Sequence, residues 1–110
     1  MVDTKIDKVA NADIDKAVQF AVERSFENTS QICIFIERVY VDELIADELE
    51  HKLLALARHY QAGAWDQNNV NIGPIVNSTQ HDKVLSHFED ARIKEARFLL
   101  GQDHYELPYI

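Results

Sequence analysis

The chain's only cysteine, Cys33, carries the most versatile chemistry of any residue in the sequence. A thiolate is a strong nucleophile and its thioesters hydrolyse readily, so this thiol could attack a carbonyl carbon. The charged residues closest to it in sequence are Glu27, Glu37 and Arg38. The helix predicted ahead of it would present its C-terminal end, which is the wrong end of a helix dipole for a thiolate. The residues alone therefore leave two interpretations open, a competent nucleophile and an inert, partly buried thiol.

No other set of residues has the spacing of a catalytic or metal site. Glu48 and His51 form one E-x-x-H pair, whereas metal–carboxylate bundles need two such motifs and further glutamates. His81 and His87 are not neighbours on a helix, so we predict no metal site. Trp65 is expected to anchor a loop against the body of the domain, with ligand stacking as the alternative. The acidic residues that could suggest paired catalytic carboxylates are expected to lie on solvated helix faces; they are Asp47, Glu48, Glu50, Glu89 and Asp90.

Hydrophobic periodicity predicts the elements that must position these residues. An apolar stripe with helical spacing runs from Ile14 to Phe26, behind Asn11 or Asp13 as a cap. β-branched and aromatic residues then predict a buried strand over 36–41. The remaining predicted elements are a helix from Asp42 to about Tyr60, a loop over 61–77, a helix capped by Ser78 or Thr79, a short strand over 97–100, and an edge strand or extended tail over 105–110.

This order of elements predicts an α/β fold, a small and mostly parallel sheet with about three helices. A chain of 110 residues is long enough for a single domain. We therefore assign residues 1–110 to one domain and expect residues 1–10 to form a loose N-terminal segment.

The charge balance argues against several classes of partner. The 11 basic residues are scattered among 19 acidic ones, so there is no basic cluster for nucleic acid or for an anionic membrane surface. No apolar run approaches the roughly 18 residues that cross a bilayer. One cysteine cannot form an internal disulfide, so we expect a cytoplasmic location.

Residues 26–41 resemble the nucleophile segment of the aldehyde dehydrogenase superfamily. In that family Phe-x-Asn-x-Gly-Gln-x-Cys leads into a strand with Glu-Arg-(Val/Ile)-Tyr-Val; here Phe-Glu-Asn-Thr-Ser-Gln-Ile-Cys ends at Cys33 and leads into Glu-Arg-Val-Tyr-Val. Further segments are similar to the family in the same order along the chain: residues 11–18, 38–49, 71–77 (Asn-Ile-Gly-Pro-Ile-Val-Asn) and 80–101. The resemblance covers roughly residues 11–110.

The resemblance implies part of the catalytic domain of an NAD(P)-dependent aldehyde dehydrogenase, with Cys33 as the nucleophile and its backbone N–H helping to hold the oxyanion. In the family reaction the thiolate attacks the aldehyde, a hydride passes to the nicotinamide, and water hydrolyses the thioester with help from a carboxylate base. The family's base and oxyanion asparagine would precede this chain, and its Glu-Ile-Phe-Gly-Pro stretch would follow Ile110. The chain's three glycines, Gly63, Gly73 and Gly101, lie too far apart for a pyrophosphate-binding loop. We therefore expect no cofactor in this chain, although the family uses NAD or NADP, and no activity from the chain alone.

Two positions depart from the family pattern. Ser30 stands where the nucleophile segment has glycine, and Glu95 stands where the family usually has glycine at a helix end. Glycine permits a left-handed backbone that a residue with a Cβ resists. We expect both changes to favour local regularity; a left-handed Glu95 would cost roughly 1 kcal/mol, or the helix would run on. A natural fragment, a decayed paralogue and an isolated or redesigned segment all remain open, and we favour the last.

Two further functional classes remain open. One is a non-catalytic α/β module, structural or self-associating, whose exposed sheet edges would support a homodimer or strand exchange. The other is a stand-alone thiol enzyme, such as an esterase that needs no cofactor.

Overall fold

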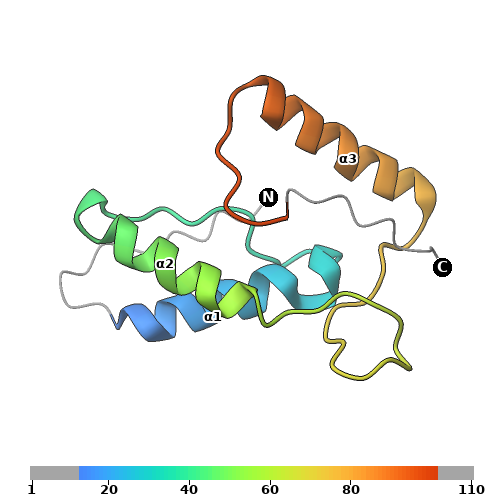
Figure 1. Ribbon diagram of the computed structural model, residues 1–110, viewed down its shortest axis with the longest axis horizontal. Helices are drawn as coiled ribbons and strands as arrows, with labels where there is room; N and C mark the ends of the chain where they lie inside the picture. Colours follow the sequence, from blue (N-terminus) through green and yellow to red (C-terminus); the bar gives the residue numbers. More distant parts are fainter. Residues whose placement is uncertain (1–12, 102–110) are drawn as a thin grey trace. The chain divides into compact units, whose positions relative to one another are not determined.

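The computed structural model describes residues 13–101. Within them lie three α-helices, α1 (Ile14–Phe26), α2 (Ala46–Ala57) and α3 (Ser78–Ile93), and two short 3-10 helices, η1 (Glu27–Ser30) and η2 (Glu43–Ile45) (Figure 1). The chain divides into two compact units, Met1–Gly73 and Pro74–Ile110. The single domain over 1–110 stays a prediction, and the loose segment 1–10 lies outside the described residues.

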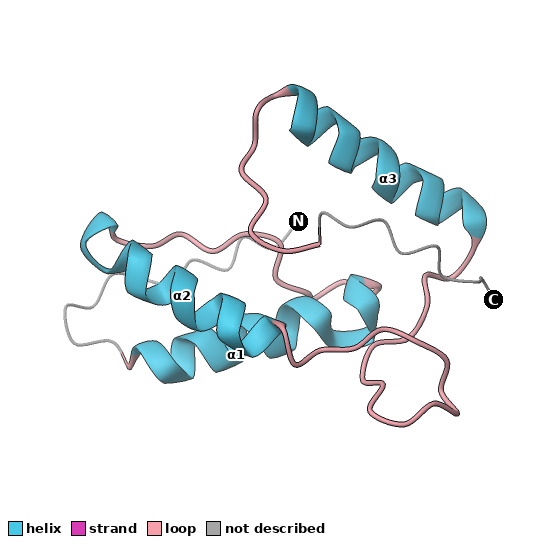
Figure 2. Ribbon diagram, in the orientation of Figure 1, coloured by secondary structure: helices cyan, strands magenta, loops and turns pink. Residues whose placement is uncertain are grey.

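The first unit is built on α1 and α2, which lie side by side (Figures 1 and 2). The predicted helix over 14–26 is confirmed, and Asp13 caps it by accepting a hydrogen bond from the backbone N–H of Lys16 at 3.2 Å. That N–H lowers the pKa of Asp13, because it stabilises the carboxylate. The buried residues of this unit come from both helices and from the segment between them; they are Val18, Ala21, Val22, Ile36 and Leu49.

The second helix of this unit was predicted to run from Asp42 to about Tyr60. Asp42 does start it, because its carboxylate accepts from the N–H of Leu44 at 2.9 Å, but the first turn is η2 and α2 ends at Ala57. The last turn continues as single turns up to Tyr60, whose ring stacks on that of Phe26 with centroids 4.9 Å apart. This aromatic contact joins the C-terminal end of α1, which leads toward Cys33, to the chain that follows α2.

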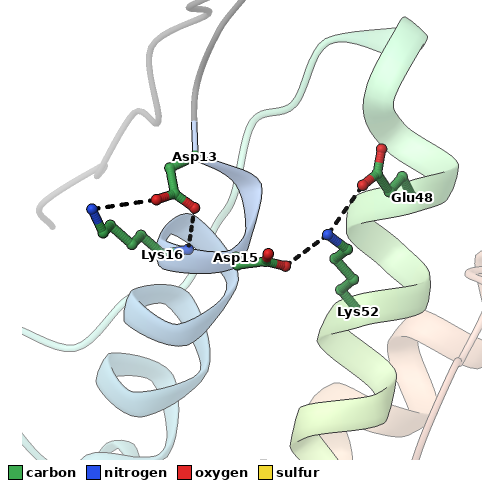
Figure 3. A network of polar contacts seen from close by, with 5 residues as sticks. All are labelled: Asp13, Asp15, Lys16, Glu48 and Lys52. Atoms are coloured by element: carbon green, nitrogen blue, oxygen red, sulfur yellow. Dashed lines mark hydrogen bonds and ion pairs between the residues drawn. The ribbon is translucent and has the colours of Figure 1, made fainter.

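A lysine links the two helices at their surface. The Nζ atom of Lys52 lies 2.6 Å from a carboxylate oxygen of Asp15 on α1 and 3.1 Å from one of Glu48 on α2 (Figure 3). The hydrogen bond to Asp15, followed by that to Glu48, raises the pKa of Lys52 above its usual value. Because the carboxylates of Asp15 and Glu48 are 80% and 55% exposed, water weakens these ion pairs, and they add little to the stability of the helix pair.

The predicted α/β fold with a small, mostly parallel sheet is wrong. Residues 13–101 contain no strand, and the only β-type pairing among them is one isolated parallel bridge between Ala62 and Ile72. Residues 36–41 are extended but belong to no sheet, and residues 97–100 form no strand either. A strand exists only where a second strand pairs with it. The segment 36–41 has the composition of a strand but no partner strand within residues 13–101. Its Ile36 is buried, whereas Tyr40 and Val41 are exposed. The tail over 105–110 lies outside the described residues.

The second unit carries α3, which Asn77 caps by accepting from the N–H of Gln80 at 2.9 Å. The prediction that Ser78 or Thr79 caps this helix is therefore wrong by one or two residues. The rings of Phe88 and Phe98 lie 5.8 Å apart, which brings the chain after the helix back onto it. No helix among residues 13–101 has the length and apolarity to span a bilayer.

Glu95 ends α3 with a left-handed backbone, at φ 58°. Its N–H donates to the carbonyl of Arg92 at 3.0 Å, and the N–H of Ala96 donates to the carbonyl of Ala91 at 2.9 Å. These two bonds form the Schellman motif, in which glycine usually holds the left-handed place. The expectation that Glu95 favours local regularity is therefore wrong, because the helix stops and the glutamate takes the glycine conformation.

Replacing Glu95 with glycine is expected to stabilise α3 by about 1 kcal/mol, because glycine takes a positive φ without steric cost. The measurement is the urea midpoint of the helical circular-dichroism signal. His87→Gly, an exposed change within the regular part of α3, is the control and is expected to destabilise the helix by roughly 0.5 kcal/mol. A Glu95→Gly chain that is less stable than the parent would contradict this account.

The lysine link predicts a loss of stability at high pH. A group whose folded pKa is raised contributes stability that is present below its unfolded pKa, about 10.5, and is lost as the pH rises through the folded value. The urea midpoint of the parent chain should therefore fall between pH 9 and pH 12 by more than that of Lys52→Arg, since arginine stays charged throughout this range. Equal falls of the urea midpoint in the two chains would contradict a role for Lys52.

Candidate active site around Cys33

The sulfur of Cys33 is presented on an exposed turn. Cys33 and Ile34 are the central residues of a turn that the N–H of Phe35 closes on the carbonyl of Ile32 at 3.2 Å. The Cys33 side chain is free and exposed. Its own N–H donates to no backbone carbonyl within residues 13–101. Of the two interpretations of the thiol, the partly buried one does not fit this exposure.

The residues just ahead of the turn form a left-handed run. Asn28, Thr29 and Ser30 have φ values of 49°, 57° and 59°. Asn28 and Gln31 hold the run together, since the Asn28 amide donates to the carbonyl of Gln31 at 3.1 Å and the N–H of Gln31 donates to the carbonyl of Asn28 at 3.0 Å. Ser30 therefore has the conformation that the family's glycine permits, and the expectation that it favours local regularity is wrong.

Hydroxyl groups tie this run to its surroundings. The hydroxyl of Thr29 donates to the carbonyl of Gly73 at 2.7 Å, and that of Ser30 donates to the carbonyl of Ser25 in the last turn of α1. Gly73 belongs to the Asn-Ile-Gly-Pro segment that resembles the family, so the fold brings two of the matching segments together. Threonine rarely takes a positive φ, and the bond to Gly73 offsets part of that cost.

On the far side of the turn, Ile36 is fixed to the same end of α1. Its N–H donates to the carbonyl of Arg24 at 3.3 Å, and its carbonyl accepts from the hydroxyl of Ser25 at 3.1 Å. The Ile36 side chain is buried. The seven residues from Ser30 to Ile36 thus begin and end on one turn of α1, with the thiol between the two attachments.

The acidic candidates that form ion pairs do so with basic residues of their own helix. Glu48 is paired with Lys52, and His51 on the same helix is exposed. Glu89 and Asp90 form ion pairs within α3, with Arg92 at 2.8 Å and with Lys94 at 2.7 Å. No group of three or more metal-ligating side chains occurs among residues 13–101.

Trp65 does not anchor its loop, contrary to prediction, because 95% of its surface is exposed. The loop is held instead by Asn71, whose side chain accepts from the N–H of Gln61 at 2.6 Å. Within the loop, a Cβ added at Gly63 would come within 2.5 Å of the Gln67 side chain, so this glycine makes room for a neighbour in its own loop.

The described residues do not fit a dinucleotide. A pyrophosphate site needs several glycines at a strand-to-helix turn. Gly63 is filled by its own loop, Gly73 and Gly101 have open space around them, and no strand leads into a helix within residues 13–101. We therefore assign no hydride-transfer step to this part of the chain.

Sequence reasoning found Cys33 but missed the hydroxyls that hold its turn, namely those of Ser25, Thr29 and Ser30. Short polar residues beyond a helix end often bond to nearby backbone carbonyls, and their density after Arg24 was the available signal. The carbonyl that each hydroxyl reaches depends on the folded chain, and the sequence alone did not indicate it.

Comparison with known proteins identifies the segment. The model of the aldehyde dehydrogenase family matches residues 9–108. The 2-hydroxymuconic semialdehyde dehydrogenase of Pseudomonas sp. (strain CF600) is 33% identical over 99 residues, which are 90% of this chain and 20% of that protein. The cytosolic aldehyde dehydrogenase 1 of Elephantulus edwardii is 35% identical over 92 residues, 84% of this chain and 18% of that one.

The solved structures agree with the sequence matches. The NAD-dependent aldehyde dehydrogenase from Sinorhizobium meliloti superposes with a TM-score of 0.82 at 29% identity, over 91% of this chain and 21% of that chain. The chain thus spans about a fifth of the length of the relatives it matches. With a family model that matches nearly its whole length, the chain belongs to the aldehyde dehydrogenase family.

Proposed function

We propose that this chain is a segment of an aldehyde-oxidising catalytic domain in which Cys33 is the nucleophile. The observation that carries the proposal is the exposed thiol on a turn attached at both ends to α1. The parent reaction would be oxidation of an aldehyde to an acid with NAD or NADP, as in the NAD-dependent relative named above. We propose a cytoplasmic location for it, in keeping with the name of the cytosolic relative.

The step that the chain's own residues support is addition of the thiol to an aldehyde. The sulfur of Cys33 bonds to the carbonyl carbon, the carbon–oxygen π bond opens, and the thiol proton ends on the oxygen, so nothing is oxidised or reduced. The backbone N–H of Cys33, which donates to no backbone carbonyl within residues 13–101, would stabilise the developing oxyanion. Oxidation of the adduct would need residues and a nicotinamide that this segment has no evident place for, so we propose that the chain alone does not turn over.

Incubation with an aldehyde and either nicotinamide cofactor is expected to give no cofactor reduction, read by absorbance. A carbon-13-labelled aldehyde is expected to form a thiohemiacetal that NMR detects, and Cys33→Ala should abolish the signal. Reduction that depends on Cys33 would contradict the inactive-segment proposal. Absence of the adduct in the parent chain would contradict Cys33 as a nucleophile. Hydrolysis of an activated ester faster than by a free thiol would favour the cofactor-free esterase instead.

A second candidate function is self-association. Beside the buried Ile36, the extended segment exposes Ile34 at 58%, Tyr40 at 50% and Val41 at 40% of their surfaces. Exposed β-branched and aromatic residues on a segment that forms no strand within residues 13–101 favour pairing with the same segment of a second chain. The chain would then be a structural module, a homodimer formed by pairing or exchange of residues 36–41.

Light scattering after size-exclusion chromatography is expected to show a dimer whose fraction grows with concentration. Tyr40→Lys should return the chain to a monomer, because it places a charge in the pairing segment. Trp65→Lys removes an even more exposed aromatic residue from a different place and should leave the dimer intact. A clean monomer at the highest soluble concentration would rule out the self-association proposal.

A further inference from the structure

We propose that Ser25 is a positioning residue for Cys33, and that its hydroxyl and carbonyl together clamp the turn that carries the thiol. The proposal deepens the function proposed above, since a fixed direction of attack matters only for a thiol that reacts. Ser25 lies in the last turn of α1, eight residues before the sulfur in sequence. It does not touch the reacting atoms and acts through the backbone on either side of them.

The clamp has one contact on each side of the turn. Ahead of the turn, the carbonyl of Ser25 accepts a hydrogen bond from the hydroxyl of Ser30. Behind it, the hydroxyl of Ser25 donates to the carbonyl of Ile36 at 3.1 Å. Ser25 therefore contacts both ends of the segment that holds Cys33, and the bond from the N–H of Ile36 to the carbonyl of Arg24 adds to the hold on the far end. Closing a short segment at both ends removes most of the conformations open to the residues between them.

The surroundings make Ser25 a firm base for this purpose. The preceding turn of α1 carries Ala21 and Val22, which are 2% and 3% exposed, and Ile36 is 5% exposed. Both contacts of Ser25 are partly buried, where a hydrogen bond is less weakened by competing water. Motion of the turn relative to α1 would break one of these contacts or expose Ile36.

Ser30 shows why the clamp is needed. At φ 59° its side chain pays the steric penalty of a left-handed backbone, and glycine at this place would avoid it. The penalty comes from the Cβ of Ser30, and the hydroxyl on that Cβ supplies the bond to Ser25. The Ser30 side chain is thus held by a hydrogen bond that glycine could not make, so the turn keeps its left-handed entry with less freedom than glycine would give it.

The test uses the full chain and its single thiol, labelled with a trifluoromethyl reagent for fluorine NMR. Ser25→Ala should let the label move more freely, seen as slower transverse relaxation. In the unlabelled chain it should raise amide exchange at Phe35 and Ile36 about fivefold, the effect of losing one hydrogen bond. Ser25→Thr keeps a hydroxyl and should restore both values. Ser86→Ala removes a hydroxyl that donates within α3, to the carbonyl of Lys83, and should change neither.

A second variant separates positioning from stability. Ser30→Gly relieves the left-handed strain, so the urea midpoint should rise or stay the same, yet the label on Cys33 should become more mobile. A residue with only a structural role would move both readouts in the same direction.

The proposal is overturned if Ser25→Ala leaves the relaxation of the label unchanged. It is also overturned if threonine does not restore it, or if the amides of Ala21 and Val22 exchange faster to the same degree as that of Ile36. These readouts need no turnover, so an ordered thiol that forms no adduct would refute the proposed nucleophile and leave the clamp standing.

Discussion

The contact between α1 and α2 is the constraint on which the first unit depends. Every buried side chain among the described residues belongs to it or to the segment that crosses it. Truncating a buried Leu or Ile to alanine typically costs about 2–5 kcal/mol. With so few buried residues, one such change would remove most of the contact. The turn that carries Cys33 is hydrogen-bonded to the last turn of α1. The position of the thiol therefore depends on the packing of α1 against α2.

The sequence allowed the helices to be predicted because their information is local. The stripe from Ile14 to Phe26 and the cap at Asp13 lie within a few residues of what they specify. The strand over 36–41 failed for the opposite reason. Strand propensity describes how well a side chain fits a paired surface, and the pairing partner is not in the same stretch of sequence. The chain spans about a fifth of the length of its relatives, and residues 13–101 contain no second strand that could pair with residues 36–41.

In the candidate site, too, the sequence predicted what depends on neighbouring residues and missed what depends on distant ones. Cys33 could be found from its segment because the spacing from Phe26 to the thiol is itself the signal. The bonds that hold its turn join Ser25 to Ile36, eleven residues apart, and Thr29 to Gly73, forty-four residues apart. Which carbonyl a hydroxyl reaches is decided by the packing of α1 and by the path of the loop before Gly73. A sequence pattern carries the donors but not the acceptors.

Ser30 and Glu95 show how a backbone conformation can be kept after the residue that favours it is gone. At each place hydrogen bonds hold the left-handed backbone that glycine would adopt without strain. Two backbone hydrogen bonds at the end of α3 hold Glu95, and the hydroxyl bond to Ser25 holds Ser30. Strained conformations persist where the surroundings over-determine them. The two places differ in where the compensation comes from. For Glu95 it comes from the backbone of its own helix, and any side chain would receive it. For Ser30 it comes from the side chain itself, so this position depends on the identity of the residue, and so does the rigidity of the turn that follows.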